Sequence, residues 1–182
     1  MQTSPHHVPC DGPSADAAPA VIGDLVQRAT QAHAALMRGD LGRYRSLILH
    51  SDDFALMAPF GGKPTRAVDL SSERWEAIGR FFRNGRDSTL ELVHAYHSTD
   101  MVVLAAIERT HVEVGDMPGQ DWSLRVTLVF RRDKEQGKKQ EGKPENGHEK
   151  ERWLLVHRHA DPLVGAIPIE QAAALARGAS AS

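Results

Sequence analysis

Two histidines, an arginine and an aspartate end an apolar run in the stretch ERWLLVHRHADP, residues 151–162. In a β-strand, side chains two residues apart lie on the same face. His157, His159 and Asp161 would then share a face and could bind a divalent metal ion. The same residues also fit a structural or interface role, because Asp161 precedes Pro162 and so suits the turn that ends a strand. The pattern favours the structural role, and the metal site stays an alternative.

The residue types give little support to nucleophilic catalysis. Cys10 is the single cysteine and lies among prolines and glycines near the N-terminus. In the sequence, no serine lies in the elbow motif that activates a nucleophile. A lone cysteine also excludes an intrachain disulfide framework and a multi-cysteine zinc site. We therefore expect no cofactor, and a cytoplasmic location.

Length and charge indicate one globular domain. The chain has 182 residues, 41% of them hydrophobic, and a net charge of −2. This length is enough for one core that folds without disulfides or metal. A nearly neutral chain is not attracted to nucleic acid or to an anionic membrane, and its apolar runs are shorter than the roughly 20 residues of a membrane helix. We expect neither partner.

Two stretches have too few apolar residues to belong to the core. Residues 1–19 are rich in Pro, Ser, Asp and His, and we expect them to form a disordered tail. Residues 134–150 carry Gly, Pro and mixed charge between two strand-like runs, which predicts a flexible hairpin loop. The domain would then span 20–165, and residues 166–182 would form a C-terminal tail with room for a short helix.

The remaining segments follow a clear order. Apolar residues at helical spacing predict a first helix over 19–38 that stops at Gly39, and a short second helix over 40–49. A short strand over 53–60 and a third helix ending at Gly85 come next. Four strands, at 88–98, 101–114, 121–132 and 151–160, would form a curved antiparallel meander. Helices followed by a meander indicate the α+β class.

Several of these segments resemble the SnoaL-like and ketosteroid-isomerase-like branch of the nuclear-transport-factor-2-like superfamily. The resemblance rests on RGDL at 38–41, APFGG at 58–62, RVTLVFRRD at 125–133 and RWLLVHRHADP at 152–162. The last strand pair also resembles the association domain of calmodulin-dependent kinases, with its Trp-three residues-His-x-His pattern. The resemblance implies a cone, in which a strongly bent sheet wraps around the helices, with a ligand pocket inside and a homodimer formed through the outer face.

Alternation divides each of the last two strands into two faces. One face of 121–132 has Trp122, Leu124, Val126, Leu128 and Phe130, and the other has Ser123, Arg125, Thr127, Val129 and Arg131. Alignment with the isomerases puts Thr127 and Arg158 inside the cone. The stripes that contain Trp122 and Trp153 would then lie outside, as the homodimer interface.

This orientation predicts an apolar pocket with a few polar groups. Its candidate residues are Phe60, Trp75, Phe81, His94, Glu108, Arg125, Thr127 and Arg158. A buried charge is costly unless it is paired or used on a ligand. Two alternatives follow: Glu108 pairs internally with Arg125 or Arg158, or an arginine binds the carboxylate or phenolate of a ligand.

The resemblance does not extend to the isomerase chemistry. Those enzymes use as general base the aspartate of an Asp-Pro pair after the short strand, where this chain has Ala58. Their oxyanion-hole tyrosine and aspartate correspond here to Ala32 and Thr127. The ketosteroid-isomerase mechanism is therefore not expected, and whether the chain is an enzyme stays open.

Three functions remain as hypotheses. The first is a binding domain for a partly apolar organic ligand, which could be an acid held by Arg125 and Arg158. The second is an isomerase, dehydratase or cyclase that uses Glu108 as acid and base. The third is a structural oligomerisation domain. Arginines beside Glu108 would lower its pKa and make it a weaker base, which favours binding over catalysis.

Overall fold

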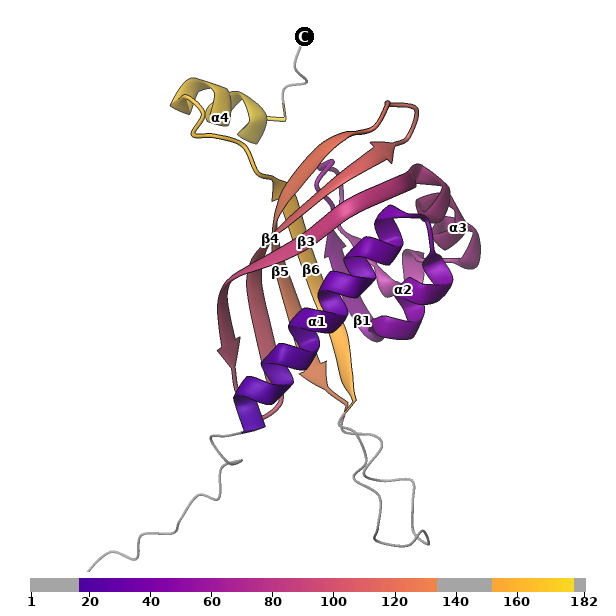
Figure 1. Cartoon of the computed structure of the whole chain (residues 1–182). Helices are drawn as coiled ribbons and strands as arrows, with labels where there is room; N and C mark the ends of the chain where they lie inside the picture. Colours follow the sequence, from indigo (N-terminus) through magenta and orange to yellow (C-terminus); the bar gives the residue numbers. More distant parts are fainter. Residues whose placement is uncertain (1–16, 134–151, 179–182) are drawn as a thin grey trace, which may run out of the picture.

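The computed structural model describes residues 17–133 and 152–178, and Figure 1 shows helices packed on one side of a curved sheet. Most of the expected N-terminal tail and the whole expected loop at 134–150 lie outside the described residues. The first helix, α1 (Ala17–Met37), includes the last three residues of the expected tail and crosses in front of the sheet. The expected α+β class is confirmed.

Three helices cover the sheet, and side-chain caps define where two of them begin. In α2 (Leu41–Leu47), Asp40 accepts a hydrogen bond from the backbone N–H of Arg43 at 2.9 Å. In α3 (Ser72–Phe81), Ser71 caps the first turn in the same way. Between α1 and α2, Gly39 adopts a φ of 77°, a conformation that ends a helix and favours glycine.

The sheet has the order β2-β1-β6-β5-β4-β3. Its strands are β1 (Leu49–Met57), β2 (Thr65–Arg66), β3 (Phe82–His97), β4 (Met101–Val114), β5 (Gln120–Arg132) and β6 (Trp153–Pro162), with a 3-10 turn, η1 (Ala67–Asp69), after β2. Neighbours from β3 to β6 pair antiparallel, as the expected meander requires. β1 adds to β6 in parallel, so the strand that follows the first two helices completes the inner face.

The third helix is shorter than expected, because the chain continues from Phe81 directly into β3. Gly85 does not stop a helix: it lies in β3 and is buried against the end of α1. A Cβ at this position would come within 2.6 Å of the backbone of Met37. The glycine is therefore required for a close approach between strand and helix, a contact that local spacing cannot reveal.

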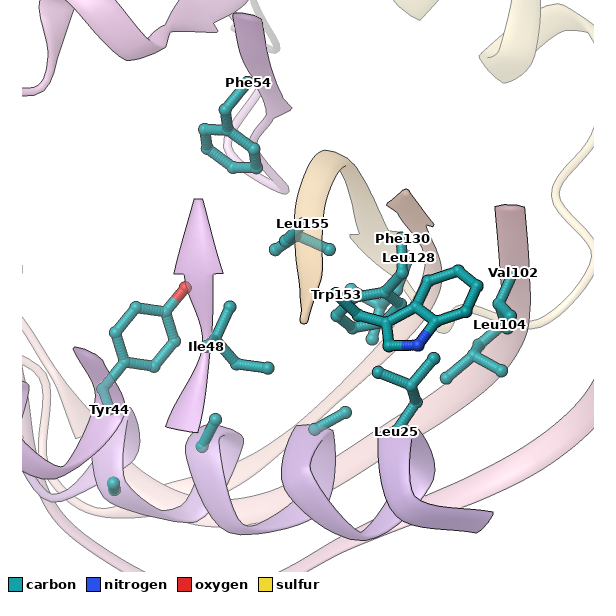
Figure 2. Packing of buried hydrophobic residues seen from close by; sticks show 13 residues of the cluster. Leu25, Tyr44, Ile48, Phe54, Val102, Leu104, Leu128, Phe130, Trp153 and Leu155 are labelled. Atoms are coloured by element: carbon teal, nitrogen blue, oxygen red, sulfur yellow. The ribbon is translucent and has the colours of Figure 1, made fainter. Parts of the chain in front are cut away.

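The main core lies between the inner face of the sheet and α1. Figure 2 shows Leu128, Phe130 and Trp153 on the strands directed toward the helix, and Leu25 directed back toward them. Phe130 is 1% exposed and Trp153 is 5% exposed. These side chains form one continuous apolar cluster, which stabilises the contact between layers.

The predicted orientation of β5 is therefore wrong, and so is that of the start of β6. Leu124, Val126, Leu128 and Phe130 face the helices, whereas Arg125 and Thr127 face outward. In β5, the residue that pairs with Arg158 is Leu128 and not Thr127. At the start of β6 the cause is a β-bulge: Val129 pairs with His157 and Phe130 with Leu155, which leaves Val156 as an extra residue. Leu155 and Arg158 consequently both point inward, although strict alternation would place them on opposite faces.

The C-terminal segment leaves the sheet after β6 and contains a short helix, α4 (Ile169–Ala176), which stands apart from the sheet in Figure 1. Its two large apolar side chains, Ile169 and Leu175, are exposed. Among the helices of the described segments, none is long and apolar enough to cross a membrane.

Candidate functional site

A buried ionic cluster lies on the inner face of the sheet under α1. Arg158 on β6 donates two hydrogen bonds to the two carboxylate oxygens of Glu108 on β4, at 2.8 and 2.6 Å. His33 on α1 places Nδ1 3.2 Å from Glu108 Oε2. The pairing that the sequence left open is thus between Glu108 and Arg158. The guanidinium fork matches the carboxylate, a geometry that compensates for much of the cost of burial.

Local sequence explains how each member of the cluster reaches the core. Glu108 follows the alternation of β4, whose even-numbered residues from Val102 onward point inward. Arg158 points inward because the bulge at Val156 changes the alternation of β6. His33 comes one helical turn after Ala29, on the buried face of α1, where small side chains let the helix approach the sheet.

Opposing effects act on the pKa of Glu108. Burial alone would raise the pKa of this carboxyl, but the charge of Arg158, the proximity of His33 and the Arg158 hydrogen bonds outweigh burial and lower it. Glu108 is therefore a carboxylate at neutral pH and holds its proton poorly. Such a group orients its neighbours well and is a weak general base.

Burial also lowers the pKa of His33, against the opposing attraction of Glu108. His33 is consequently neutral at pH 7, and one ring nitrogen carries the single proton. The tautomer with the proton on Nδ1 is favoured, since Nδ1 lies 3.2 Å from a carboxylate oxygen that only accepts hydrogen bonds. The other nitrogen, Nε2, is buried and has no hydrogen-bond partner among the described residues.

A second polar pair lies beside the cluster. Tyr44 Oη and His50 Nε2 share a hydrogen bond of 3.0 Å. Burial raises the pKa of Tyr44 to about 12. Burial and, to a smaller extent, the charge of Arg45 lower the pKa of His50 to about 4. Both groups are uncharged at neutral pH, so this wall of the site presents polar atoms without net charge.

A cavity of about 350 Å³, which we call the main cavity, opens between the helices and the inner face. Its wall includes the aromatic side chains Phe54, Phe60, Trp75, Phe81, Phe82 and Trp122. Its polar wall residues are Tyr44, His50, Thr65, Arg74 and Arg158. An apolar cavity with a few convergent polar groups is the usual form of a small-molecule site.

A smaller space of about 30 Å³, which we call the inner void, lies deeper in the core. It is bordered by His33 and Glu108, and it shares Leu36, Tyr44 and Arg158 with the wall of the main cavity. The two spaces therefore adjoin along these shared residues. The inner void has room for about one water molecule or one hydroxyl group.

The structure separates the predicted site residues into two groups. Phe60, Trp75 and Phe81 border the main cavity, Arg158 borders both spaces, and Glu108 borders the inner void. The other three predicted residues, His94, Arg125 and Thr127, line neither of these spaces.

Arg125, Thr127 and His94 do not reach either space. Arg125 and Thr127 lie on the outer face because Val126, between them, points inward. His94 lies on the exposed strand β3, against the ring of Tyr96. An acid held jointly by Arg125 and Arg158 is therefore excluded, because the two arginines lie on opposite faces of the sheet.

Sequence reasoning missed His33, Tyr44, His50 and Trp122. His33 had a detectable signal: it continues the series of Leu25 and Ala29 at helical spacing and is the polar member of an apolar face. Trp122 was assigned to the outer face with the other apolar residues of its stripe. It borders the main cavity, 5.8 Å from the ring of Phe60.

Two of the three residues of the alternative metal site, His157 and Asp161, have other partners. His157 Nδ1 donates to the backbone carbonyl of Ala55 at 2.9 Å and so fastens β6 to β1. Both carboxylate oxygens of Asp161 accept from Arg125. Within residues 17–133 and 152–178, no group of three or more His, Cys, Asp or Glu side chains is arranged to hold a metal ion.

Comparison with known proteins adds the family. Residues 26–138 match the model of the SnoaL-like domain. No curated protein matches the chain. The fold is similar to a nuclear transport factor 2-like superfamily protein from Salmonella enterica serovar Typhimurium, at 15% identity and a TM-score of 0.58 over 82% of this chain and 96% of that one.

Two further solved structures have the same fold at low identity. A nuclear transport factor 2-like protein from Cytophaga hutchinsonii has 14% identity and a TM-score of 0.55, over 80% of this chain and 98% of that one. The association domain of calcium/calmodulin-dependent protein kinase II from C. elegans has 14% identity and a TM-score of 0.52, over the same shares. By its sequence match the chain belongs to the SnoaL-like domain family, and its fold is similar to that of nuclear transport factor 2-like proteins.

Proposed function

We propose that the main cavity binds a small, largely apolar organic molecule. The observation that supports this proposal is a cavity of about 350 Å³ with six phenylalanine and tryptophan side chains and few polar groups in its wall. Volumes of this size are typical of small-molecule sites. An unfilled apolar cavity lowers the free energy of unfolding, and a ligand that fills the cavity would recover part of this loss.

The charges around the cavity favour a neutral ligand. Arg158 is the cation at the deep end, and its charge is already balanced by Glu108. A carboxylate placed beside Arg158 would therefore also lie near a buried carboxylate, which reduces the net attraction. Arg74, at the wall formed by α3, is the remaining cation that borders the cavity.

Titration with indane, a compact apolar hydrocarbon, tests the proposal by ligand-observed NMR. We expect saturable binding to the purified chain. Ala58→Trp places a large ring in the cavity wall and should abolish binding, whereas Val68→Trp, at a residue that is 78% exposed, should leave it unchanged. Absence of saturable binding to the unmodified chain would contradict the proposal and favour a structural oligomerisation domain.

An enzyme that uses Glu108 as acid and base receives less support. Glu108 borders the inner void, where its carboxylate accepts hydrogen bonds from Arg158 and lies 3.2 Å from His33 Nδ1. A carboxylate held in this way binds a proton weakly, so proton abstraction from a ligand carbon would be slow. The isomerase base position, Ala58, borders the main cavity and carries no ionisable group.

We also propose a homodimer through the outer face, on residues other than the tryptophan stripes. Val93, Ala105, Ile107 and Thr127 border a hollow of about 250 Å³ on this face. An exposed apolar hollow on an open sheet fits a second copy of the same surface. Sedimentation at micromolar concentration should give a dimer, and Ile107→Arg should give a monomer with an intact cavity. A monomeric unmodified chain would exclude this interface.

A further inference from the structure

We propose that the ligand is an alcohol, whose hydroxyl group enters the inner void and donates a hydrogen bond to His33 Nε2. This inference rests on the proposed function, since the hydrocarbon part of the alcohol would occupy the main cavity. It assigns to His33 a role as the hydrogen-bond acceptor that selects the ligand.

The orientation of His33 follows from its partner. Nδ1 lies 3.2 Å from the Glu108 oxygen that accepts from Arg158, and this nearby carboxylate favours the tautomer with the proton on Nδ1. Nε2 is then an acceptor with a free lone pair, in a side chain that is 3% exposed. A buried acceptor without a donor costs free energy, and a donor that enters the site removes this cost.

The inner void provides the space for that donor. It borders His33 and adjoins the main cavity along Leu36, Tyr44 and Arg158. Its volume of about 30 Å³ admits one hydroxyl group and excludes a bulkier polar group such as a carboxylate. The site is therefore selective by size as well as by hydrogen bonding.

Charge also selects an alcohol over the common ionic groups. Glu108 and Arg158 form a neutral pair beside the void, and His33 adds no charge at neutral pH. An ammonium group would lie near the guanidinium of Arg158, and a carboxylate would lie near Glu108. A hydroxyl group avoids both repulsions, and its oxygen can accept a hydrogen bond while it donates one.

Three probes with the same ring system separate these alternatives: indane, indan-2-ol and indane-2-carboxylate. We expect indan-2-ol to bind about three- to tenfold more tightly than indane, which corresponds to one net hydrogen bond. The carboxylate should bind no better than indane. Affinities can be measured by ligand-observed NMR on the purified full chain.

Two variants assign the preference to His33 and to the inner void. His33→Phe keeps a ring of similar shape and removes the acceptor, so indan-2-ol and indane should bind equally well. Ala32→Val retains His33 but fills the inner void, which Ala32 borders, and should have the same effect. His94→Phe removes an exposed histidine from β3 and serves as the matched control with unchanged preference.

The outcomes distinguish this inference from the proposed function. If indane binds and indan-2-ol binds no more tightly, or if the carboxylate binds most tightly, the alcohol site is wrong and the apolar cavity stands. If the preference for indan-2-ol survives in both His33→Phe and Ala32→Val, the hydroxyl group contacts another residue and the inference fails. If none of the three probes binds, the proposed function itself fails.

Discussion

The two faces of the sheet each carry an arginine–carboxylate pair, and the pairs differ mainly in burial. On the inner face, the Glu108 and Arg158 side chains are 2% and 18% exposed. On the outer face, the Asp161 and Arg125 side chains are 40% and 57% exposed. Similar chemistry therefore occurs in two dielectric environments, and both pairs have one member on β6, Arg158 in the inner pair and Asp161 in the outer pair. Only the inner pair is therefore positioned to influence stability and ligand choice strongly.

The largest effect should come from removing one partner of the inner pair. Glu108→Ala leaves the guanidinium of Arg158 buried without its carboxylate, and we expect a loss of about 3–5 kcal/mol in the free energy of unfolding. Urea titration measures this loss. The double variant Glu108→Leu with Arg158→Met should recover most of it, because an apolar pair of similar volume has no charge to desolvate. A loss below about 1 kcal/mol in the single variant would contradict a buried pair.

The adjacent residues Leu154 and Leu155 test the faces without changing charge. Leu155 is 2% exposed and faces the core, whereas Leu154 precedes it on the half-buried outer side. Leu155→Ala should lower the free energy of unfolding by about 2–4 kcal/mol, and Leu154→Ala by less than about 1 kcal/mol. The reverse order in chemical denaturation would mean that the alternation of β6 is shifted by one residue before the bulge.

Acid should lower the free energy of unfolding, through the histidines of the inner face, at a pH above that at which most carboxylates become protonated. The pKa values of His33 and His50 are lowered by burial, that of His50 to about 4, whereas an unfolded histidine titrates near 6.5. Between these values the unfolded chain binds more protons than the folded chain, so stability falls as the pH drops from about 6.5 toward 4. We expect a loss on the order of 2 kcal/mol over this range.

The pH effect has a direct control. In His50→Phe the slope of stability against pH between about 6.5 and 4 should be shallower, since one of the two buried histidines no longer titrates. Thermal unfolding at closely spaced pH values records this slope. An unchanged slope would show that His50 is accessible to protons in the folded chain.

The smallest effect should come from the outer pair. In the monomeric variant Ile107→Arg, Asp161→Ala removes a solvent-exposed partner of Arg125, and we expect a change of about 0–1 kcal/mol that decreases with added salt. Chemical denaturation at low and high salt measures both quantities. A loss comparable to that of Glu108→Ala in this monomer would mean that the outer pair is buried within a single chain.

Much of the fold could be predicted because it follows from local periodicity. The helical spacing from Val21 to Leu36 predicted α1, and the alternation of β4 placed Glu108 on a single face. The turn residues between the strands predicted the meander. These signals depend on residues close in sequence, and they agree with the structure except at the ends of elements.

The candidate site was only partly predictable. Phe60, Trp75 and Phe81 were expected in the pocket and border the main cavity. Arg125 and Thr127 were misplaced because the alignment with the isomerases put Thr127 on the same face as Arg158, whereas the residue of β5 that pairs with Arg158 is Leu128. His33 was missed because a histidine in a helix shows its role only when the carboxylate that faces it is known.

The sequence by itself determined the α+β class and the order of helices and strands. It also placed Glu108 and Arg158 among apolar residues. Tertiary structure decided which residues meet. The bulge at Val156 depends on how β6 pairs with both of its neighbours, and Gly85 is required only because α1 packs against β3. Both features arise between segments distant in sequence, where no local period acts, and they determine that Arg158 reaches Glu108 and His33 instead of solvent.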